Sequence, residues 1–164
     1  MDDVNVRISR LEPMRVASVL GFGTEPEMEA WGKLIDWAKP LGLLDQPDQH
    51  FIFGFNHPEP MPGSPNYGYE LWLPVKSQVE SQGDVEIKEF PGGLYAVARC
   101  EVKGNPSETI PAAWQRLVQW REQSRFKSAS HQWLEAFIEI SRMAEGFFTL
   151  DLYLPVAEYS QGDV

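Results

Sequence analysis

The sequence predicts an α+β fold in which one β-α-β-β unit occurs twice, as a tandem repeat with pseudo-twofold symmetry. Three observations support this prediction. Two motifs recur at nearly the same offset, apolar residues change from strand spacing to helix spacing within each half, and proline or glycine separates the segments. The strands are expected to form an antiparallel sheet with the helices on one face and a central groove on the other.

The duplication is clearest in a helical motif and a strand motif. The pattern Ala-Trp-x-x-Leu-x-x-Trp begins at Ala30 and again at Ala113. Residues 70–75 read ELWLPV, and residues 151–156 read DLYLPV. Shorter matches occur in the same order, between residues 6–8 and 85–87 and between residues 14–17 and 95–98. Four matches in order indicate two copies of one unit.

The chain is therefore expected to form one domain, residues 1–164, built of two repeats at about 4–76 and 84–157. A linker at 77–83 joins the repeats, and its serine, glutamine and glycine residues are typical of a flexible connection. Each repeat begins with a β-branched strand that is interrupted, by Pro13 in the first half and by Pro91 in the second.

Prolines bound the helix of the first repeat. The first turn of a helix accepts proline, so Pro26 marks the expected start. Pro40 disfavours the helical conformation of the residue before it, so the helix is expected to end near Lys39. The strands of this repeat are expected at residues 4–8, 15–20, 51–55 and 67–75.

The second repeat follows the same plan. Trp114, Leu117 and Val118 have the i, i+3, i+4 spacing of an amphipathic helix, and Pro111 marks its expected first turn. Trp114 and its counterpart Trp31 are interpreted as packing between helix and sheet. The strands of this repeat are expected at residues 85–90, 94–102, 133–140 and 147–156.

Alternation along the strands assigns their side chains to two faces. Leucines of the last strand of each repeat are expected to pack beneath the helices, together with Leu134, Ala136, Ile138, Phe51, Phe53 and Phe55. The other face would then carry large aromatic rings mixed with carboxylates, and no helix remains to cover it. Such a face is typical of a ligand-binding surface. The predicted ligand-binding residues are Glu135, Trp72, Trp133, Phe137, Tyr153, Tyr69, Glu70 and Asp151.

Composition excludes several classes of function. The chain has 14 Lys and Arg against 24 Asp and Glu, a formal net charge of -10, which argues against direct nucleic-acid binding and permits attraction to cations. No apolar run is long enough to span a membrane, the N-terminus lacks a signal peptide, and the single Cys100 forms no internal disulfide, so a cytoplasmic protein is expected. The three histidines lack metal-ligand spacing and no phosphate loop is present, so neither a metal nor another cofactor is expected.

Several segments together resemble a known family. They are residues 10–17, residues 90–97, the helical Ala113-Trp114-x-x-Leu117, the strand Trp133-Leu134-Glu135 and residues 150–156. The chain resembles the gyrase-inhibitor-like (GyrI-like) small-molecule-binding domains, which also serve as effector domains of multidrug-responsive bacterial transcription regulators. The resemblance implies binding of lipophilic, often cationic drugs between aromatic walls, with a buried glutamate that Glu135 matches. A strand-edge glutamate in water is the alternative interpretation of Glu135.

Three functions stay open at this point. The first is the binding of small hydrophobic cations for drug or toxin sequestration or sensing. The second, implied by the resemblance, is a hydrolase of strained electrophiles such as cyclopropane-containing antibiotics, with Glu135 and a tyrosine, Tyr95 or Tyr69, as catalytic residues. The third is a protein-interaction module of gyrase-inhibitor type, in which the acidic surface faces a basic protein partner.

Overall fold

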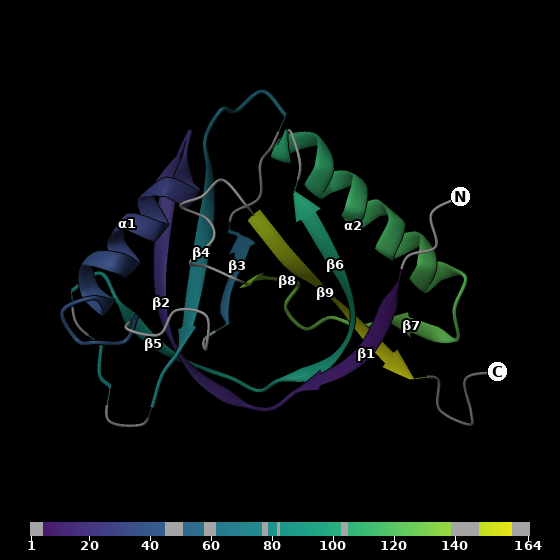
Figure 1. Cartoon of the computed structure of the whole chain (residues 1–164), viewed down its shortest axis with the longest axis horizontal. Coiled ribbons are helices and arrows are strands. Elements are labelled where there is room, and N and C mark those ends of the chain that lie inside the picture. The colour runs from purple at the N-terminus through teal and green to yellow at the C-terminus, as the bar shows by residue number, and fades with distance from the viewer. Residues whose placement is uncertain are drawn as a thin grey trace. The chain divides into compact units, whose positions relative to one another are not determined.

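The computed structural model describes residues 5–44, 51–57, 62–76, 79–81, 83–102, 105–138 and 148–158 (Figure 1). The predicted α+β class and the repeated order of strands and helix are confirmed. In chain order the elements are β1 (Val6–Leu11), β2 (Met14–Gly23), α1 (Pro26–Ala38), β3 (Ile52–Asn56), β4 (Tyr67–Pro74), β5 (Glu86–Phe90), β6 (Gly93–Val102), α2 (Pro106–Glu122), β7 (Phe126–Ser128), β8 (Leu134–Ile138) and β9 (Phe148–Glu158).

The structure divides into two compact units that do not coincide with the two sequence repeats. Unit 1 comprises residues 1–12 and 92–164, and unit 2 comprises residues 13–91. β1 pairs with β6 in unit 1, and β5 pairs with β2 in unit 2. The first strands of the two repeats are therefore exchanged. β1 of the first repeat joins unit 1, which is otherwise built from the second repeat, and β5 of the second repeat joins unit 2, which is otherwise built from the first. The chain passes from one unit to the other at Pro13 and at Pro91, the two prolines that interrupt the strands in the sequence.

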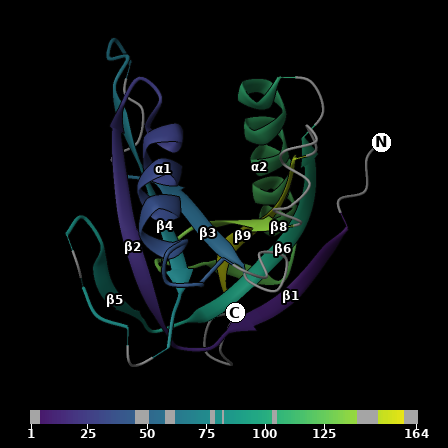
Figure 2. The same cartoon turned by 60° about the vertical axis from the view of Figure 1, so that its left-hand side comes forward.

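Unit 2 is a four-stranded antiparallel sheet in the order β3-β4-β2-β5, with α1 lying along β2 and β4 (Figure 2). The helix begins at Pro26 and ends at Ala38, as predicted, and it buries Pro26, Ala30, Leu34 and Ala38. The helix approaches β2 most closely at Gly21, where an added Cβ would lie 2.8 Å from the backbone nitrogen of Ala30. Glycine at this position lets the helix and the strand meet.

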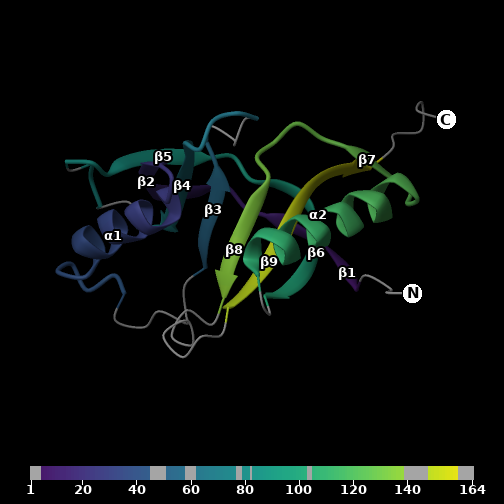
Figure 3. The same ribbon diagram turned by 90° about the horizontal axis from the view of Figure 1, so that it is seen from above.

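Unit 1 contains an antiparallel sheet in the order β1-β6-β9-β8, and β7 pairs with the end of β9. α2 contacts β6, β7 and β9 and crosses this sheet as Figure 3 shows. The prediction that Pro111 lies at the helix start is wrong, because α2 begins at Pro106 and Pro111 lies inside it. Pro106 occupies the first helical position, where the missing N–H costs nothing, so it is the true start signal. The three-residue β7 was not predicted because its periodicity is too short to read.

The register corrects the predicted faces of β3 and β8. Directly opposite residues of an antiparallel pair project to the same face. Leu134 lies opposite Tyr153 and Glu135 opposite Leu152, so Glu135 shares the face of the β9 leucines. Phe53 likewise lies opposite Trp72. The error arises because both sheet faces are apolar: Phe53 and Leu134 are as buried as the leucines, so hydrophobicity alone does not tell the faces apart.

Candidate functional site

Glu135 lies on the helix-covered face of unit 1, where it binds one of two packed tryptophans. The indole Nε1 of Trp114, on α2, donates a hydrogen bond of 3.1 Å to Glu135 Oε2. The ring of Trp133, which immediately precedes β8, lies 5.2 Å from the Trp114 ring between centroids, with the two planes tilted by 41°. Trp133 is 41% exposed. The carboxylate is therefore held by one indole, and a second indole that solvent reaches packs against the first.

Buried apolar groups continue this face away from Glu135. Phe137 lies opposite Leu150, which also lies opposite Cys100 of β6. Burial raises the pKa of the Cys100 thiol; the nearby Arg116 opposes that shift and the Glu135 charge adds to it. The thiol is therefore neutral at physiological pH and packs as an apolar group.

A second acid, Glu70 of β4, lies on the face of unit 2 that α1 does not cover, and its charge is already balanced. Its Oε2 accepts hydrogen bonds from Lys88 Nζ at 2.9 Å, Ser18 Oγ at 2.7 Å and Trp72 Nε1 at 2.6 Å. Burial alone would raise the pKa of Glu70, but the hydrogen bonds from Lys88, Ser18 and Trp72 outweigh it and lower the pKa. Lys88 thus serves as an internal cation for this acid.

Aromatic rings complete the surroundings of Glu70. The Trp72 ring lies 4.9 Å from Phe55 and 5.2 Å from Phe90 between centroids. Trp72 is buried and its N–H is used by Glu70. The structure therefore places the predicted pair of Glu70 and Trp72 in a closed, internally satisfied cluster.

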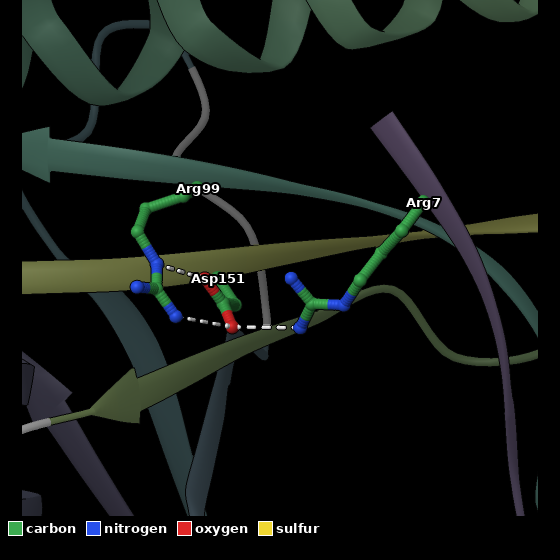
Figure 4. A network of polar contacts seen from close by, with 3 residues as sticks. All are labelled: Arg7, Arg99 and Asp151. Carbon is green, nitrogen blue, oxygen red and sulfur yellow. Dashed lines mark hydrogen bonds and ion pairs between the residues drawn. The ribbon is translucent and has the colours of Figure 1, made fainter. Parts of the chain in front are cut away.

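Asp151 and Tyr153 lie on the face of unit 1 opposite to Glu135. Asp151 accepts hydrogen bonds from Arg7 Nη2 at 2.9 Å and Arg99 Nε at 3.0 Å (Figure 4). The hydrogen bond to Asp151 is the main reason why the pKa of Arg7 is raised. Burial raises the pKa of the neighbouring Tyr153. The expectation that Glu135, Asp151 and Tyr153 share one face is therefore wrong.

The two candidate tyrosines differ in their placement. Tyr95 is fully buried, its hydroxyl donates to the carbonyl oxygen of Gln132 at 2.6 Å, and burial raises its pKa. It lies on the face with Tyr153, 5.4 Å from that ring between centroids. The structure does not bring Tyr95 to Glu135. Tyr69 lies on the face of unit 2 that α1 covers, where its ring packs onto Gly54: an added Cβ there would lie 2.6 Å from a ring carbon.

Comparison with known proteins identifies the family. The family model of Cass2, the integron-associated effector binding protein, matches residues 7–156. The chain belongs to the Cass2 family. Cass2 is a GyrI-like family, so the resemblance found in the sequence is confirmed. No curated protein matches the chain.

Solved structures share the Cass2 fold at low sequence identity. The C-terminal domain of EcmrR is 14% identical, with a TM-score of 0.67 over 95% of this chain and 99% of the domain. SAV2435 bound to tetraphenylphosphonium is 12% identical, with a TM-score of 0.54 over 93% of this chain and 94% of that one. A hydrolase encoded by lin2189 from Listeria innocua is 13% identical, with a TM-score of 0.64 over 93% and 91% of the two chains.

The match to EcmrR in its complex with DNA shows a difference in length. This Cass2 family member spans 58% of that EcmrR chain, at 13% identity. The shared part is the fold of the EcmrR C-terminal domain.

Sequence reasoning missed several residues of these clusters in the Cass2 chain. Trp114 was assigned to packing, although its N–H binds Glu135. Arg7 and Lys88 were not singled out, although they pair with Asp151 and Glu70. The predicted match of residues 6–8 with 85–87 aligned Arg7 with Glu86, whereas the ion pairs make Lys88 its counterpart.

Neither a cluster of metal-ligating side chains nor a membrane-spanning helix occurs among the described residues. Within the ranges that the structure describes, no three His, Cys, Asp or Glu side chains gather as metal ligands would. Neither helix, over its described length, is long and apolar enough to cross a lipid bilayer.

Proposed function

We propose that this Cass2 family member binds a small hydrophobic cation at Glu135, in the sequestration or sensing of a drug or toxin in the cytoplasm. The observation that carries the proposal is the hydrogen bond from Trp114 to Glu135, with Trp133 beside it. A carboxylate attracts a cation directly, and the faces of indole rings attract it through their quadrupoles. The two effects together favour a bulky, charged, apolar ligand.

The exposure of the cluster also supports the proposal. Trp133 is partly open to solvent, whereas Phe137 on the same face is buried. The accessible Trp133 ring offers a ligand an apolar surface that loses water on binding, and the buried Phe137 extends the apolar side chains of the same face. Glu135 is the acid that we assign to the ligand, because it lies beside Trp114 and near the partly exposed Trp133.

Tetraphenylphosphonium is the natural first probe, because SAV2435, which shares the fold, has been solved with it. We expect saturable quenching of tryptophan fluorescence and a matching heat of binding. The substitution Glu135→Gln removes the charge and keeps the shape. It should weaken binding by about 10- to 100-fold, or about 1.4–3 kcal/mol.

A matched control is Glu122→Gln at the exposed end of α2, where the acid pairs with Arg121. This control removes one negative charge of the chain without touching the Glu135 cluster. An equal loss of affinity in both variants, or no binding by the wild-type protein, would contradict the proposal.

A second candidate function is hydrolysis of a strained electrophile such as a cyclopropane-containing antibiotic. The description of the lin2189 protein, which has this fold, as a hydrolase favours this alternative. Glu135 would move the proton of the attacking water. The hydroxyl of Tyr95 already donates to the carbonyl oxygen of Gln132, so we assign the proton transfer to Glu135 alone.

Mass spectrometry separates the two functions. An unchanged ligand after long incubation supports binding alone. A product heavier by one water, formed by the wild-type protein and not by the Glu135→Gln variant, would establish the hydrolase.

A further inference from the structure

Trp133 lies just outside the strand ladder that orders its neighbours. The pairing of β8 with β9 begins at Leu134, one position later. The Trp133 side chain is 41% exposed, and its ring packs against the Trp114 ring, whose N–H binds Glu135. The direction of the chain just before this indole therefore depends on contacts other than those of the ladder.

The two residues that precede Trp133 are held by the start of β6. The carbonyl oxygen of Leu94 lies 2.7 Å from His131 Nε2. Because a carbonyl oxygen only accepts, Nε2 carries the proton in this contact and donates it. The hydroxyl of Tyr95 donates to the carbonyl oxygen of Gln132 at 2.6 Å. Two hydrogen bonds therefore fix consecutive residues of the segment, one through a side chain and one through the backbone.

Ring packing strengthens the attachment of this segment. The rings of His131 and Tyr95 lie 4.8 Å apart between centroids and meet edge to face, with an interplanar angle of 84°, a favourable geometry for an aromatic pair. Gly93 makes room for the imidazole, because an added Cβ would lie 2.6 Å from His131 Cδ2 and 2.8 Å from Nε2. Residues 93–95 thus form the seat of the His131 ring.

We propose that His131 and Tyr95 are positioning residues that hold Trp133 in place for the ligand of Glu135. This inference rests on the function proposed for Glu135. Tyr95 is fully buried and lies on the face of unit 1 opposite to Glu135, so it acts through Gln132 and not by touching the ligand. An indole that is already held in place loses less conformational freedom on binding, which raises the affinity.

Titration calorimetry with tetraphenylphosphonium measures the effect on affinity. His131→Ala should weaken binding by about three- to tenfold, and Tyr95→Phe, which removes only the hydroxyl, by a similar factor. His131→Gln should keep most of the affinity, because a glutamine amide donates from nearly the position of Nε2. Tyr67→Phe is the matched control, since it removes a hydroxyl that binds Glu27 in unit 2.

A double-mutant cycle with Trp133 separates positioning from a general loss of stability. In the Trp133→Ala background, adding His131→Ala should cost no further affinity, because the histidine acts only through the indole. Gly93→Ala is a second way to move the imidazole, since the added methyl group would meet the ring. It should weaken binding as His131→Ala does, and it decides the question should His131→Ala fail to fold.

The indole N–H signal of Trp133 in NMR spectra gives a measurement that needs no ligand. It should shift in His131→Ala and in Gly93→Ala, and it should stay unchanged in Tyr67→Phe. Should the wild-type protein bind no tetraphenylphosphonium, the function proposed for Glu135 fails, whereas this signal still decides whether His131 positions Trp133.

Two results would overturn the inference while the function proposed for Glu135 stands. The first is an unchanged Trp133 signal in both His131→Ala and Gly93→Ala. The second is additive losses of affinity in the cycle, or wild-type affinity in both His131→Ala and Tyr95→Phe, in a protein whose Glu135→Gln variant binds weakly.

Discussion

Arg7 and Lys88 make equivalent ion pairs in different units. Each lies on the first strand of its repeat, and each pairs with the acid on the last strand of the other repeat, Arg7 with Asp151 and Lys88 with Glu70. The two ion pairs therefore bind the exchanged strands, β1 and β5, to the units that receive them. The contribution of each ion pair to the free energy of unfolding can be measured separately, by substituting Arg7 in one pair and Lys88 in the other.

The Lys88–Glu70 pair predicts a loss of stability in acid. The folded-state pKa of Glu70 is lowered below its unfolded value. Its contribution is therefore complete above the unfolded pKa of about 4.3 and is lost as pH falls through the lowered folded value. Lys88→Met should cost about 1–2 kcal/mol near neutral pH and move the acid-induced loss to higher pH. Urea unfolding between acid and neutral pH measures both effects.

The control for this prediction is Lys33→Met, which removes a partly exposed lysine that pairs with Glu29 on α1 and donates to the carbonyl oxygen of Leu20. A surface pair of this kind contributes little. Identical pH profiles for Lys88→Met and the wild-type protein would show that Lys88 does not set the pKa of Glu70.

Asp151 should matter more to stability than either of its arginines. Asp151→Asn removes the buried negative charge that both guanidinium groups bind and should cost about 2–4 kcal/mol. Arg7→Met should cost about 0.5–1 kcal/mol, since Arg7 is half exposed and Asp151 keeps Arg99. The free energies of unfolding in urea give the ranking. A larger loss for Arg7→Met would mean that the aspartate is not the centre of the network.

The start of α1 should make stability sensitive to alkali. The Tyr67 hydroxyl donates to both carboxylate oxygens of Glu27, at 2.6 and 2.9 Å. Burial, and then this bond to Glu27, raises the pKa of Tyr67 to about 12 from 10.0. Because folding raises the pKa of Tyr67, the hydroxyl contributes its full stabilisation of the folded state below the unfolded pKa of 10.0. That contribution is lost as pH rises from 10.0 to about 12.

Tyr67→Phe tests this prediction because it removes the hydroxyl and keeps the ring. It should cost about 1 kcal/mol at neutral pH and reduce the alkaline slope. Thermal melts at several alkaline pH values measure the slope. An unchanged slope in the variant would assign the alkaline loss to other groups.

The approach of α1 to β2 should tolerate no side chain at Gly21. A Cβ at this position would meet the backbone of Pro26 and Ala30, which is part of the helix itself. Gly21→Ala should therefore cost about 2–4 kcal/mol, measured as the free energy of unfolding. Gly32→Ala is the matched control, because nothing lies within 4 Å of its Cβ position, and alanine should stabilise the helix there by about 0.5–1 kcal/mol. Equal effects of the two substitutions would contradict the close approach.

The local elements were predictable from sequence where one residue type fixes a boundary. Pro26 and Pro40 bracket α1, and the observed helix ends within that bracket. Pro111 gave the wrong start for the second helix, because α2 begins at Pro106 and accommodates Pro111 in its interior. The partner of each first strand was not predictable, since a strand's own pattern specifies its faces and not its neighbour.

The candidate site was predictable in part for the same reason. The position of Glu135 in its strand motif singles it out, and the structure places it beside Trp133 and Trp114. The grouping of Glu135 with Asp151 failed, because β8 is apolar on both faces and its register is set only by pairing with β9. Trp114 was missed because an indole at helical spacing has the same pattern whether it packs or donates a hydrogen bond.

The exchange of first strands has a consequence for synthesis on the ribosome. β1 is translated well before its partner β6, which begins at Gly93. Residues 13–91, in contrast, form a continuous stretch that holds every strand of unit 2. Unit 2 is thus complete while the nascent chain still lacks α2, β8 and β9, and β1 waits as an unpaired edge. We therefore expect folding during translation to begin with residues 13–91, and β1 to pair only after β6 has been made.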